Sequence, residues 1–532
     1  MVKKIINILI TIIVGFVMFY ITLPAMNVHN IGFWFFVAFL ILVYACLDCL
    51  SETKNMLFKN GKAINYDMPK SLTYGIGICF VGFVVIILLN FICSPIFNAK
   101  SYQTRISVNE SGNFTEDIKE VNFSQLPLLD KASSQVLGDR VMGQMSELVS
   151  QFDVSELYTQ INYNNSILRV TPLEYADGIK WFTNRKNGIV GYITVNSVTG
   201  EAELVRLDKG MRYSSSALFN EKLERKLRFA YPTTNFGTIS FEIDNEGNPY
   251  YIVPTLKYTA IGLKAKVSGV IIFDPITGES TKYDKEEIPN WVDIAYSASL
   301  IIEQVDDWGT YKNGYLNSIF GQKNVVNTTD GYNYLAMDDD IYLYTGITSV
   351  VSDESNLGFI LTNMRTGSTT YYNVPGAEEY SAMNSAEGQV QDMGYKSTFP
   401  LLINLNGKPT YLVSLKDSSG LVKMYGFVDV KDYQKVVVTD AREGILVAKD
   451  NYLESTKKEI QDDELVIKDI KIDKINTAII NGYTNYYVTA ENKKYKISIS
   501  LSDTLPFLSI GDTLKIGYYD TEEKIVEVVK IY

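Results

Sequence analysis

The chain has 532 residues, enough for about three or four structural units. Its hydrophobic fraction of 46% and charged fraction of 21% are typical of a folded protein. The net charge of −12 argues against general nucleic-acid binding, because neutralising phosphates requires clustered Lys and Arg. The single His and all four Cys precede residue 100, so the rest of the chain excludes Ser-His-Asp and Cys-His catalysis, His/Cys zinc sites and disulfides.

Three apolar runs open the chain, at residues 5–23, 31–50 and 72–97. Each is long enough to span a bilayer core, which requires about 20 helical residues. The first run is too long for a cleaved signal peptide. We therefore expect a three-helix membrane anchor over residues 1–99.

The distribution of lysines predicts the orientation of these spans, because short cytoplasmic loops are enriched in Lys and Arg. Lys3 and Lys4 precede the first span, and the loop at 24–30 has no charged residue. We expect a multi-pass cell-membrane protein with the N-terminus inside and everything after residue 100 extracytoplasmic. The loop at 51–71 carries Lys54, Lys59, Lys62 and Lys70.

Residues beyond the anchor carry a net charge of about −15, which keeps such a region soluble. Abundant Lys, Ile, Asn and Tyr, rare Arg and the lack of Cys there are typical of a bacterial cell-envelope protein. Asp130 is a candidate N-cap of a helix over 130–151, and strands follow it. The predicted segments are a linker at 100–129, α+β modules at 130–212, 213–285 and 378–450, an aromatic-rich insertion with strands at 286–377, and a small β-barrel at 465–532.

A turn motif recurs in this region. Residues 192–201, 270–279 and 359–368 each combine an apolar strand, an Asn or Asp, and Thr-Gly three residues later. Gly accepts positive φ in a hairpin turn, and the Asn or Asp side chain caps the adjacent backbone. Each copy therefore predicts an antiparallel hairpin.

A second repeat has a spacing of 160 residues. Residues 243–253 and 403–413 share the pattern Gly-x-Pro-x-Tyr-x-Val, and a helix-like stretch precedes each copy. Repeated units of one helix with antiparallel hairpins are expected from this pattern. The matching pairs are Gly247 and Gly407, Pro249 and Pro409, Tyr251 and Tyr411, and Val253 and Val413.

A helix, strands reading Gly-x-Pro-x-Tyr-x-Val and an apolar strand ending in Asp-x-x-Thr-Gly-Glu resemble the PepSY type of module. Asp274–Glu279 is the closest match. The resemblance covers 130–210, 214–285 and 378–435, and it departs from the family at 286–357. It implies an inhibitory or regulatory part of an extracytoplasmic protein in a Gram-positive bacterium, and it transfers no functional residue.

The segment 308–344 combines many aromatic side chains with Asn, Asp and Gln. Such residues line recognition grooves, where rings stack and amides form hydrogen bonds. A core would leave so many amides without partners, although a core of half the rings, with the amides in solvated turns, fits the sequence equally well. The predicted recognition surface is Trp308, Tyr311, Tyr315, Phe320, Tyr332, Tyr334, Asp338 and Asp340.

Carboxylates supply the remaining chemical candidates. Asp338, Asp339 and Asp340, with Asp330, leave Ca²⁺ open as a cofactor, with an exposed turn as the alternative. Paired carboxylates of a glycosidase must stand about 5 to 9.5 Å apart across a cleft. Asp306 and Asp307 beside Trp308, with Glu303 and Asp293 upstream, are the carboxylates that leave such an enzyme open as an alternative.

Five strands within 465–532 predict a five-stranded barrel that resembles the OB type. The fold class is therefore three transmembrane helices, an α+β ectodomain of repeated modules and a small β-barrel. We expect a non-catalytic scaffold, sensor or regulator with an envelope-protein or cell-wall partner, no nucleic acid, and no catalytic or metal residue. A cell-wall hydrolase and an accessory subunit of a transport or secretion complex are the alternatives.

Overall fold

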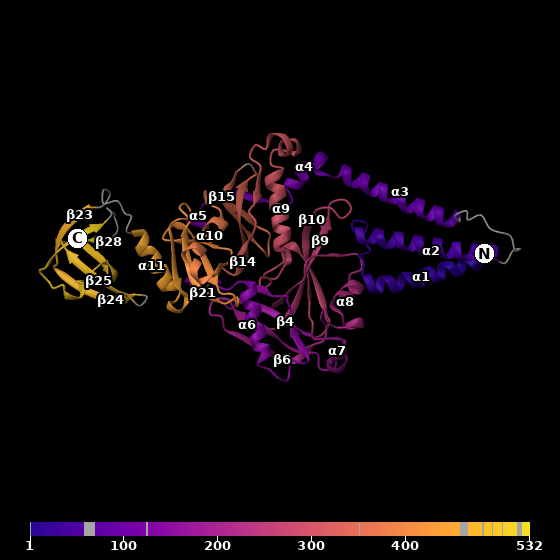
Figure 1. Cartoon of the computed structure of the whole chain (residues 1–532), viewed down its shortest axis with the longest axis horizontal. Helices are drawn as coiled ribbons and strands as arrows, with labels where there is room; N and C mark the ends of the chain where they lie inside the picture. Colours follow the sequence, from indigo (N-terminus) through magenta and orange to yellow (C-terminus); the bar gives the residue numbers. More distant parts are fainter. Residues whose placement is uncertain are drawn as a thin grey trace. The chain divides into compact units, whose positions relative to one another are not determined.

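The computed structural model describes residues 2–57, 70–123, 126–350, 352–457, 466–480, 483–491, 493–502, 504–518 and 524–532. It divides into two compact units, Met1–Ala448 and Lys449–Tyr532. The first unit contains long N-terminal helices and an α+β body, and the second is rich in strands (Figure 1).

Three helices among the described residues are long and apolar enough to cross a membrane, as the apolar runs predict. Lys59 and Lys62, which contribute to the predicted orientation, lie outside the described residues. Gly75 lets two of the helices approach closely, because a Cβ there would stand 2.7 Å from the Cβ of Ala45. The helices are α1 (Val2–Thr22), α2 (Ile31–Leu57) and α3 (Lys70–Ile92).

The end of α1 lies against the body. Arg225 donates to the backbone carbonyl of Tyr20 at 3.1 Å, and Arg228 donates to that of Leu23 at 3.0 Å. The end of α3 makes a similar contact, since the Asn90 side chain donates to the carbonyl of Ile261 at 2.9 Å. These contacts place the loop between α1 and α2 on the same side of the helices as the body.

Four sheets in the described part of the body share one strand order. In each sheet, the first two strands are short, and both pair with the long third strand. The third strand also pairs with the fourth, and the fourth pairs with the fifth. The first sheet contains β2 (Phe152–Val154), β3 (Thr159–Tyr163), β4 (Ser166–Tyr175), β5 (Ile189–Asn196) and β6 (Ala202–Met211). The second contains β7 (Asn235–Phe236), β8 (Ser240–Ile243), β9 (Pro249–Tyr258), β10 (Ala265–Phe273) and β11 (Ser280–Asp284).

The segment predicted as an insertion contains the third of these sheets, with two further strands at its edges. It contains β12 (Val326–Thr328), β13 (Asn333–Met337), β14 (Asp340–Ser349), β15 (Ser352–Asn363) and β16 (Thr369–Tyr372), joined by β1 (Val108–Gly112) and β17 (Gly376–Ala377). The fourth contains β18 (Lys396–Ser397), β19 (Leu401–Leu405), β20 (Lys408–Lys416), β21 (Val422–Asp429) and β22 (Val436–Asp440).

The Thr-Gly turns join the fourth and fifth strands of the first three sheets, as predicted. The side-chain oxygen of Asn196 accepts from the backbone N–H of Val198 and Thr199, and Gly200 has a φ of +78°. Asp274 and Asn363 accept the corresponding pairs of bonds in the other two copies.

The hairpin between the second and third strands also recurs. Gly247 and Gly407 both lie in this turn with positive φ, and Tyr251 and Tyr411 are both buried on the long third strand. Asp338, with a φ of +55°, occupies the same turn of the third sheet. The predicted acidic run is therefore the tip of a hairpin.

A helix precedes each sheet. Asp130 is the N-cap of the first, as predicted, and its side chain accepts from the backbone N–H of Ser133 at 2.9 Å. Buried residues of the first two sheets form one core, and residues of the second and third sheets form another with the helix between them. The helices are α6 (Lys131–Gly143), α8 (Leu223–Ala230), α9 (Ala298–Thr310) and α10 (Glu379–Gln389), with α4 (Pro95–Gln103), α5 (Phe114–Asp117) and α7 (Gly178–Asn184) in the connections.

The described residues of the second unit form a half-barrel sheet of six strands with its own apolar core (Figure 1). The structure adds a strand at 474–480 that is not among the five predicted from the sequence. Helix α11 (Ile445–Lys457) begins in the first unit and ends in the second. The strands are β23 (Val466–Lys471), β24 (Lys474–Ile480), β25 (Tyr483–Ala490), β26 (Lys493–Ser498), β27 (Thr513–Tyr518) and β28 (Ile525–Ile531).

Candidate functional site

A cavity of about 690 Å³ lies among the four sheets of the body. Its walls come from β3 and β4 of the first sheet, the start of β8 in the second, β13 in the third, and β19 and β20 in the fourth. The first turns of α6 and α9 complete it. We call this space the central cavity, and its volume is within the range of small-molecule sites.

Arg169 on β4 is the most unusual residue of the central cavity. It is 3% exposed, and its Nε atom has no hydrogen-bond partner. No hydrogen bond or ion pair joins its guanidinium to another residue in the part of the chain that the structure describes. Burial lowers the pKa of this side chain, but a guanidinium remains charged at any physiological pH. Arg169 is therefore a buried cation without a hydrogen-bonded or ion-paired partner, and the charge of Asp130 acts on it only from a distance.

Gln160 lies directly opposite Arg169 in the pairing of β3 with β4. Cross-strand partners project from the same face of a sheet, and both of these residues line the central cavity. Gln160 is also 3% exposed, and neither its Oε1 nor its Nε2 atom has a partner. Buried polar groups are normally hydrogen-bonded, so two adjacent exceptions that line one cavity make it the candidate site.

Two tyrosines of the predicted recognition surface also line the central cavity. Tyr332 is 41% exposed, and its ring centroid lies 5.6 Å from that of Tyr334 in an edge-to-face arrangement. Burial raises the pKa of the Tyr334 hydroxyl, and the nearby positive charge of Arg169 opposes this effect. Asn333 between them donates to the carbonyl of Phe399 at 2.8 Å and holds β13 against the fourth sheet.

The other predicted surface residues lie elsewhere. Trp308 is 5% exposed within the core around α9, where its ring centroid lies 6.2 Å from that of Tyr371. Phe320 is 82% exposed on a turn that follows α9. Tyr311 and Tyr315 are partly buried between them. The eight residues therefore do not form one surface.

The interleaved amides are satisfied locally. The side chains of Asn313 and Asn317 both donate to the carbonyl of Lys323, at 2.8 and 2.9 Å. Asn327 accepts from the Thr310 hydroxyl at 3.1 Å. A turn carbonyl and a threonine hydroxyl therefore satisfy these amides close to the buried ring of Trp308.

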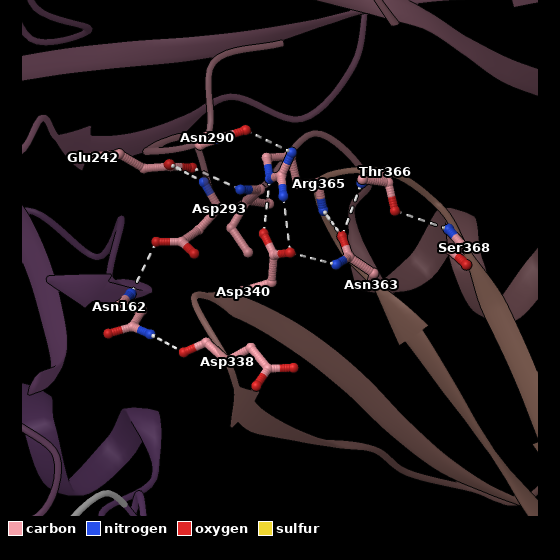
Figure 2. Close-up of polar contacts among 11 residues, drawn as sticks. Asn162, Glu242, Asn290, Asp293, Asp338, Asp340, Asn363, Arg365, Thr366 and Ser368 are labelled. Carbon is pink, nitrogen blue, oxygen red and sulfur yellow. Dashed lines mark hydrogen bonds and ion pairs between the residues drawn. The ribbon is translucent and has the colours of Figure 1, made fainter. Parts of the chain in front are cut away.

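Asp338 and Asp340 form ion pairs. Asp340 receives two bonds from the Arg365 guanidinium, at 2.7 and 2.8 Å (Figure 2). Asp338 pairs with Lys119 at 3.0 Å on the surface. Among the described residues, no group of three or more His, Cys, Asp or Glu side chains is placed to hold a metal ion.

A buried carboxylate pair lies where the first three sheets meet (Figure 2). Glu242 on β8 is fully buried and accepts from the backbone N–H of Asp293 at 2.7 Å and of Ile294 at 3.1 Å. Burial raises the pKa of Glu242 to about 7. Asp293 is 2% exposed and accepts from the backbone N–H of Asn162 at 2.9 Å, and burial and the charge of Glu242 raise its pKa well above the usual value.

The other catalytic candidates are engaged near the membrane helices. Arg105 bonds to Asp307 and to the carbonyl of Ala265, the latter at 2.7 Å. Lys264 pairs with Glu303 at 2.6 Å. Asp306 accepts from the backbone N–H of Thr328 at 2.8 Å. These carboxylates connect α9 to Arg105 after α4, to Lys264 before β10 and to Thr328 on β12.

The missed signal was Arg169 itself, a lone charge between Leu168 and Val170 in an apolar strand. A charge within an alternating strand is normally placed on the solvent face. Its lack of a partner depends on strands distant in the sequence. The sequence therefore shows a charge within an apolar strand, but it does not predict that this charge is buried without a hydrogen-bond partner.

The fold and the site define an integral membrane protein with a mixed α+β body and a cavity lined by both polar and apolar residues. No family model matches the sequence, and no curated protein matches it. The solved structures found include a sialidase of Trypanosoma rangeli, at 8% identity and a TM-score of 0.16. The alignment covers 71% of this chain and 54% of that one, so the chain spans about half of that protein's length. A likeness this low carries no argument.

Proposed function

We propose that this protein is a membrane-anchored, extracytoplasmic sensor of the cell envelope that binds a small ligand without altering it. The observation that carries the proposal is the central cavity with its unpartnered Arg169 and Gln160. Because all four sheets wall the cavity, an occupant that fills it contacts all of them. Ligand binding therefore stabilises the whole body relative to states in which the sheets separate.

The contacts of the membrane helices support a sensing role. The second sheet contributes Ser240 to the central cavity and is preceded by α8, whose Arg225 and Arg228 bind the end of α1. The second sheet therefore lies between the ligand and the membrane anchor. The lysine distribution and the position of the loop after α1 both support an extracytoplasmic body.

The proposal also covers the origin of the body. We take the four sheets as copies of a PepSY-type module and the second unit as an OB-like barrel. The shared strand order and the capped Thr-Gly turns support the first assignment. The six-stranded half-barrel supports the second.

The carboxylates favour binding over hydrolysis. Glu242 and Asp293 are almost fully buried and accept backbone hydrogen bonds, so a substrate has no route to them. Asp306 and Asp307 are bound to Thr328 and Arg105. A hydrolytic pair would need an open cleft between its two carboxylates.

A cavity-blocking variant tests the proposed function. Ala132 is exposed on α6 and lines the central cavity, so A132W obstructs its opening. R140W introduces the same bulk at an exposed position of α6 outside the cavity lining. Each full-length protein is incubated in mild detergent with small molecules extracted from the producing cells, and the retained compounds are identified by mass spectrometry.

We expect the wild type and R140W to retain the same intact compound and A132W to lose it. Retention by none of the proteins, or equal retention by all, would contradict the sensor proposal. Recovery of the compound in cleaved form would instead support the hydrolase alternative.

A further inference from the structure

We infer that the central cavity binds the carboxylate group of its ligand through Arg169, an assignment that rests on the proposed function and specifies its ligand. The first step is the cost of the buried charge. An isolated charge taken out of water is strongly unfavourable unless it is paired. Arg169 is 3% exposed and has no hydrogen-bonded or ion-paired partner among the described residues, and Asp130, whose charge acts on it, is bound to Lys416, so we infer that an external anion completes the pairing.

The second step is the net charge of the cavity lining. Its charged residues are Asp130, Lys131 and Arg169. Asp130 is neutralised by Lys416, whose Nζ atom lies 2.5 Å from its carboxylate, and it also caps α6. Burial alone would raise the pKa of Asp130, but these bonds hold it below its usual value, so the residue stays an anion committed to Lys416. The uncompensated charge of the cavity is positive, although the chain as a whole is acidic.

The third step selects carboxylate among anions. A guanidinium presents a planar fork of donors that matches the two oxygens of a carboxylate. Gln160 beside it offers a further amide donor and an acceptor. A phosphate dianion would need a second deep cation, whereas the other free cation of the lining, Lys131, is exposed.

The fourth step concerns the rest of the ligand. Tyr332, Tyr334 and Phe399 provide rings on the wall formed by the third and fourth sheets. Ser297 and Ser240 provide hydroxyl groups on the wall formed by α9 and the second sheet. A cavity of about 690 Å³ holds more than a carboxylate, so the ligand has a body with both apolar and polar groups.

The experiment compares acids with their uncharged amides. Full-length protein in detergent is heated with sodium acetate, lactate, succinate, benzoate or trialanine, or with acetamide, lactamide, succinamide, benzamide or trialaninamide, and sodium phosphate forms a separate arm. We expect at least one carboxylate to raise the melting temperature in a saturable way, and its amide and phosphate to have no such effect.

Two arginine variants localise the effect. R169M removes the charge and keeps a side chain of similar length. We expect it to weaken binding of the active carboxylate by about 10- to 100-fold and to raise the melting temperature of the ligand-free protein, because an unpaired buried charge is gone. R206M, at an exposed arginine of the same sheet that pairs with Glu147 at 2.8 Å, should bind like the wild type.

Stabilisation by acids and amides alike, by phosphate alone, or by none of the acids would overturn the carboxylate assignment. A ligand-free R169M that melts below the wild type would show that Arg169 is structural, and would overturn it too. These failures are separable from failure of the proposed function. A retained compound without a carboxylate, lost in A132W, would leave the sensor standing while removing this inference.

Discussion

Replacement of Asp293 by Asn should make the protein more stable at alkaline pH. Asp293 and Glu242 are buried together, and Asp339 and Asp340 add negative potential around Asp293, although Asp340 is itself paired with Arg365. The introduced asparagine keeps a side-chain oxygen that accepts from the backbone N–H of Asn162. The variant D293N therefore removes a charge and keeps the hydrogen bond.

The size of the effect follows from the pKa of Glu242. Burial raises this pKa from 4.5 to about 7. A carboxyl group with a raised pKa in the folded state contributes stability that is fully present below about pH 4.5 and lost as the pH rises to about 7. A tenfold change in proton affinity is about 1.4 kcal/mol, so ionising Glu242 at pH 8 costs roughly 3 kcal/mol. Asp293 carries a cost of the same sign, because burial and the charge of Glu242 hold its pKa well above the usual value, and D293N removes this cost. With the Glu242 penalty as the scale, the expected gain at pH 8 is about 1–3 kcal/mol.

Thermal unfolding of the full-length protein in detergent measures the difference in stability between D293N and the wild type. In a unit of this size, 1 kcal/mol corresponds to about 1–2 °C, so D293N should melt about 2–4 °C above the wild type at pH 8 and within about 1 °C of it at pH 5. D274N is the control, because Asn already occupies the same turn position at Asn196 and Asn363, and we expect little change at either pH. An equal loss of stability in D293N at both pH values would refute the reasoning.

Three further predictions concern single residues of the body, each read out by thermal unfolding. R105M should destabilise by about 3–5 kcal/mol, because Asp307 would lose its buried partner, and an unchanged melting temperature would show that the pair is not formed. W308A should cost about 3–5 kcal/mol and F320A less than about 0.5, since Trp308 is 5% exposed and Phe320 82%; equal effects would contradict these placements. R228A should lower the melting temperature and increase protease cleavage between α1 and α2, because its bond to Leu23 is lost; an unchanged cleavage pattern would argue against the contact.

Local chemistry carried most of the successful sequence interpretation. The apolar runs predicted the three membrane helices, since length and hydropathy alone decide whether a helix can span. The Thr-Gly turns were predictable because the Asn or Asp cap and the positive φ of Gly operate within a few residues. The N-cap at Asp130 is a signal of the same kind.

The sequence does not predict the third sheet as a further module, because one of its turns differs from those of the second and fourth sheets. Its hairpin turn is Asp338-Asp339 where the fourth sheet has Asn406-Gly407, so this turn lacks the glycine found at Gly247 and Gly407. Without the Gly-x-Pro pattern, the Thr-Gly turn at 359–368 is the segment's only match to the predicted modules, and the sequence therefore predicts an insertion. An Asp can adopt positive φ at modest cost, so the fold tolerates what the sequence pattern does not reveal.

The candidate site required long-range information. The strand around Arg169 predicts a cross-strand neighbour but not what faces it from the third and fourth sheets. The absence of a partner depends on side chains far away in the sequence, such as Tyr334 and Phe399. At Trp308 the sequence pattern predicts a surface because many amides lie nearby. The ring is buried instead, because the carbonyl of Lys323 satisfies two of those amides.

Accessibility of the central cavity from outside the cell is the most direct test of the account. In a background lacking the four native cysteines, A132C places a thiol at the opening of the cavity, and K4C places one at the far end of α1. Intact spheroplasts are treated with a membrane-impermeant maleimide. The account predicts labelling of A132C without permeabilisation and of K4C after permeabilisation alone. Labelling of K4C in intact spheroplasts, with A132C protected until the membrane is opened, would contradict it.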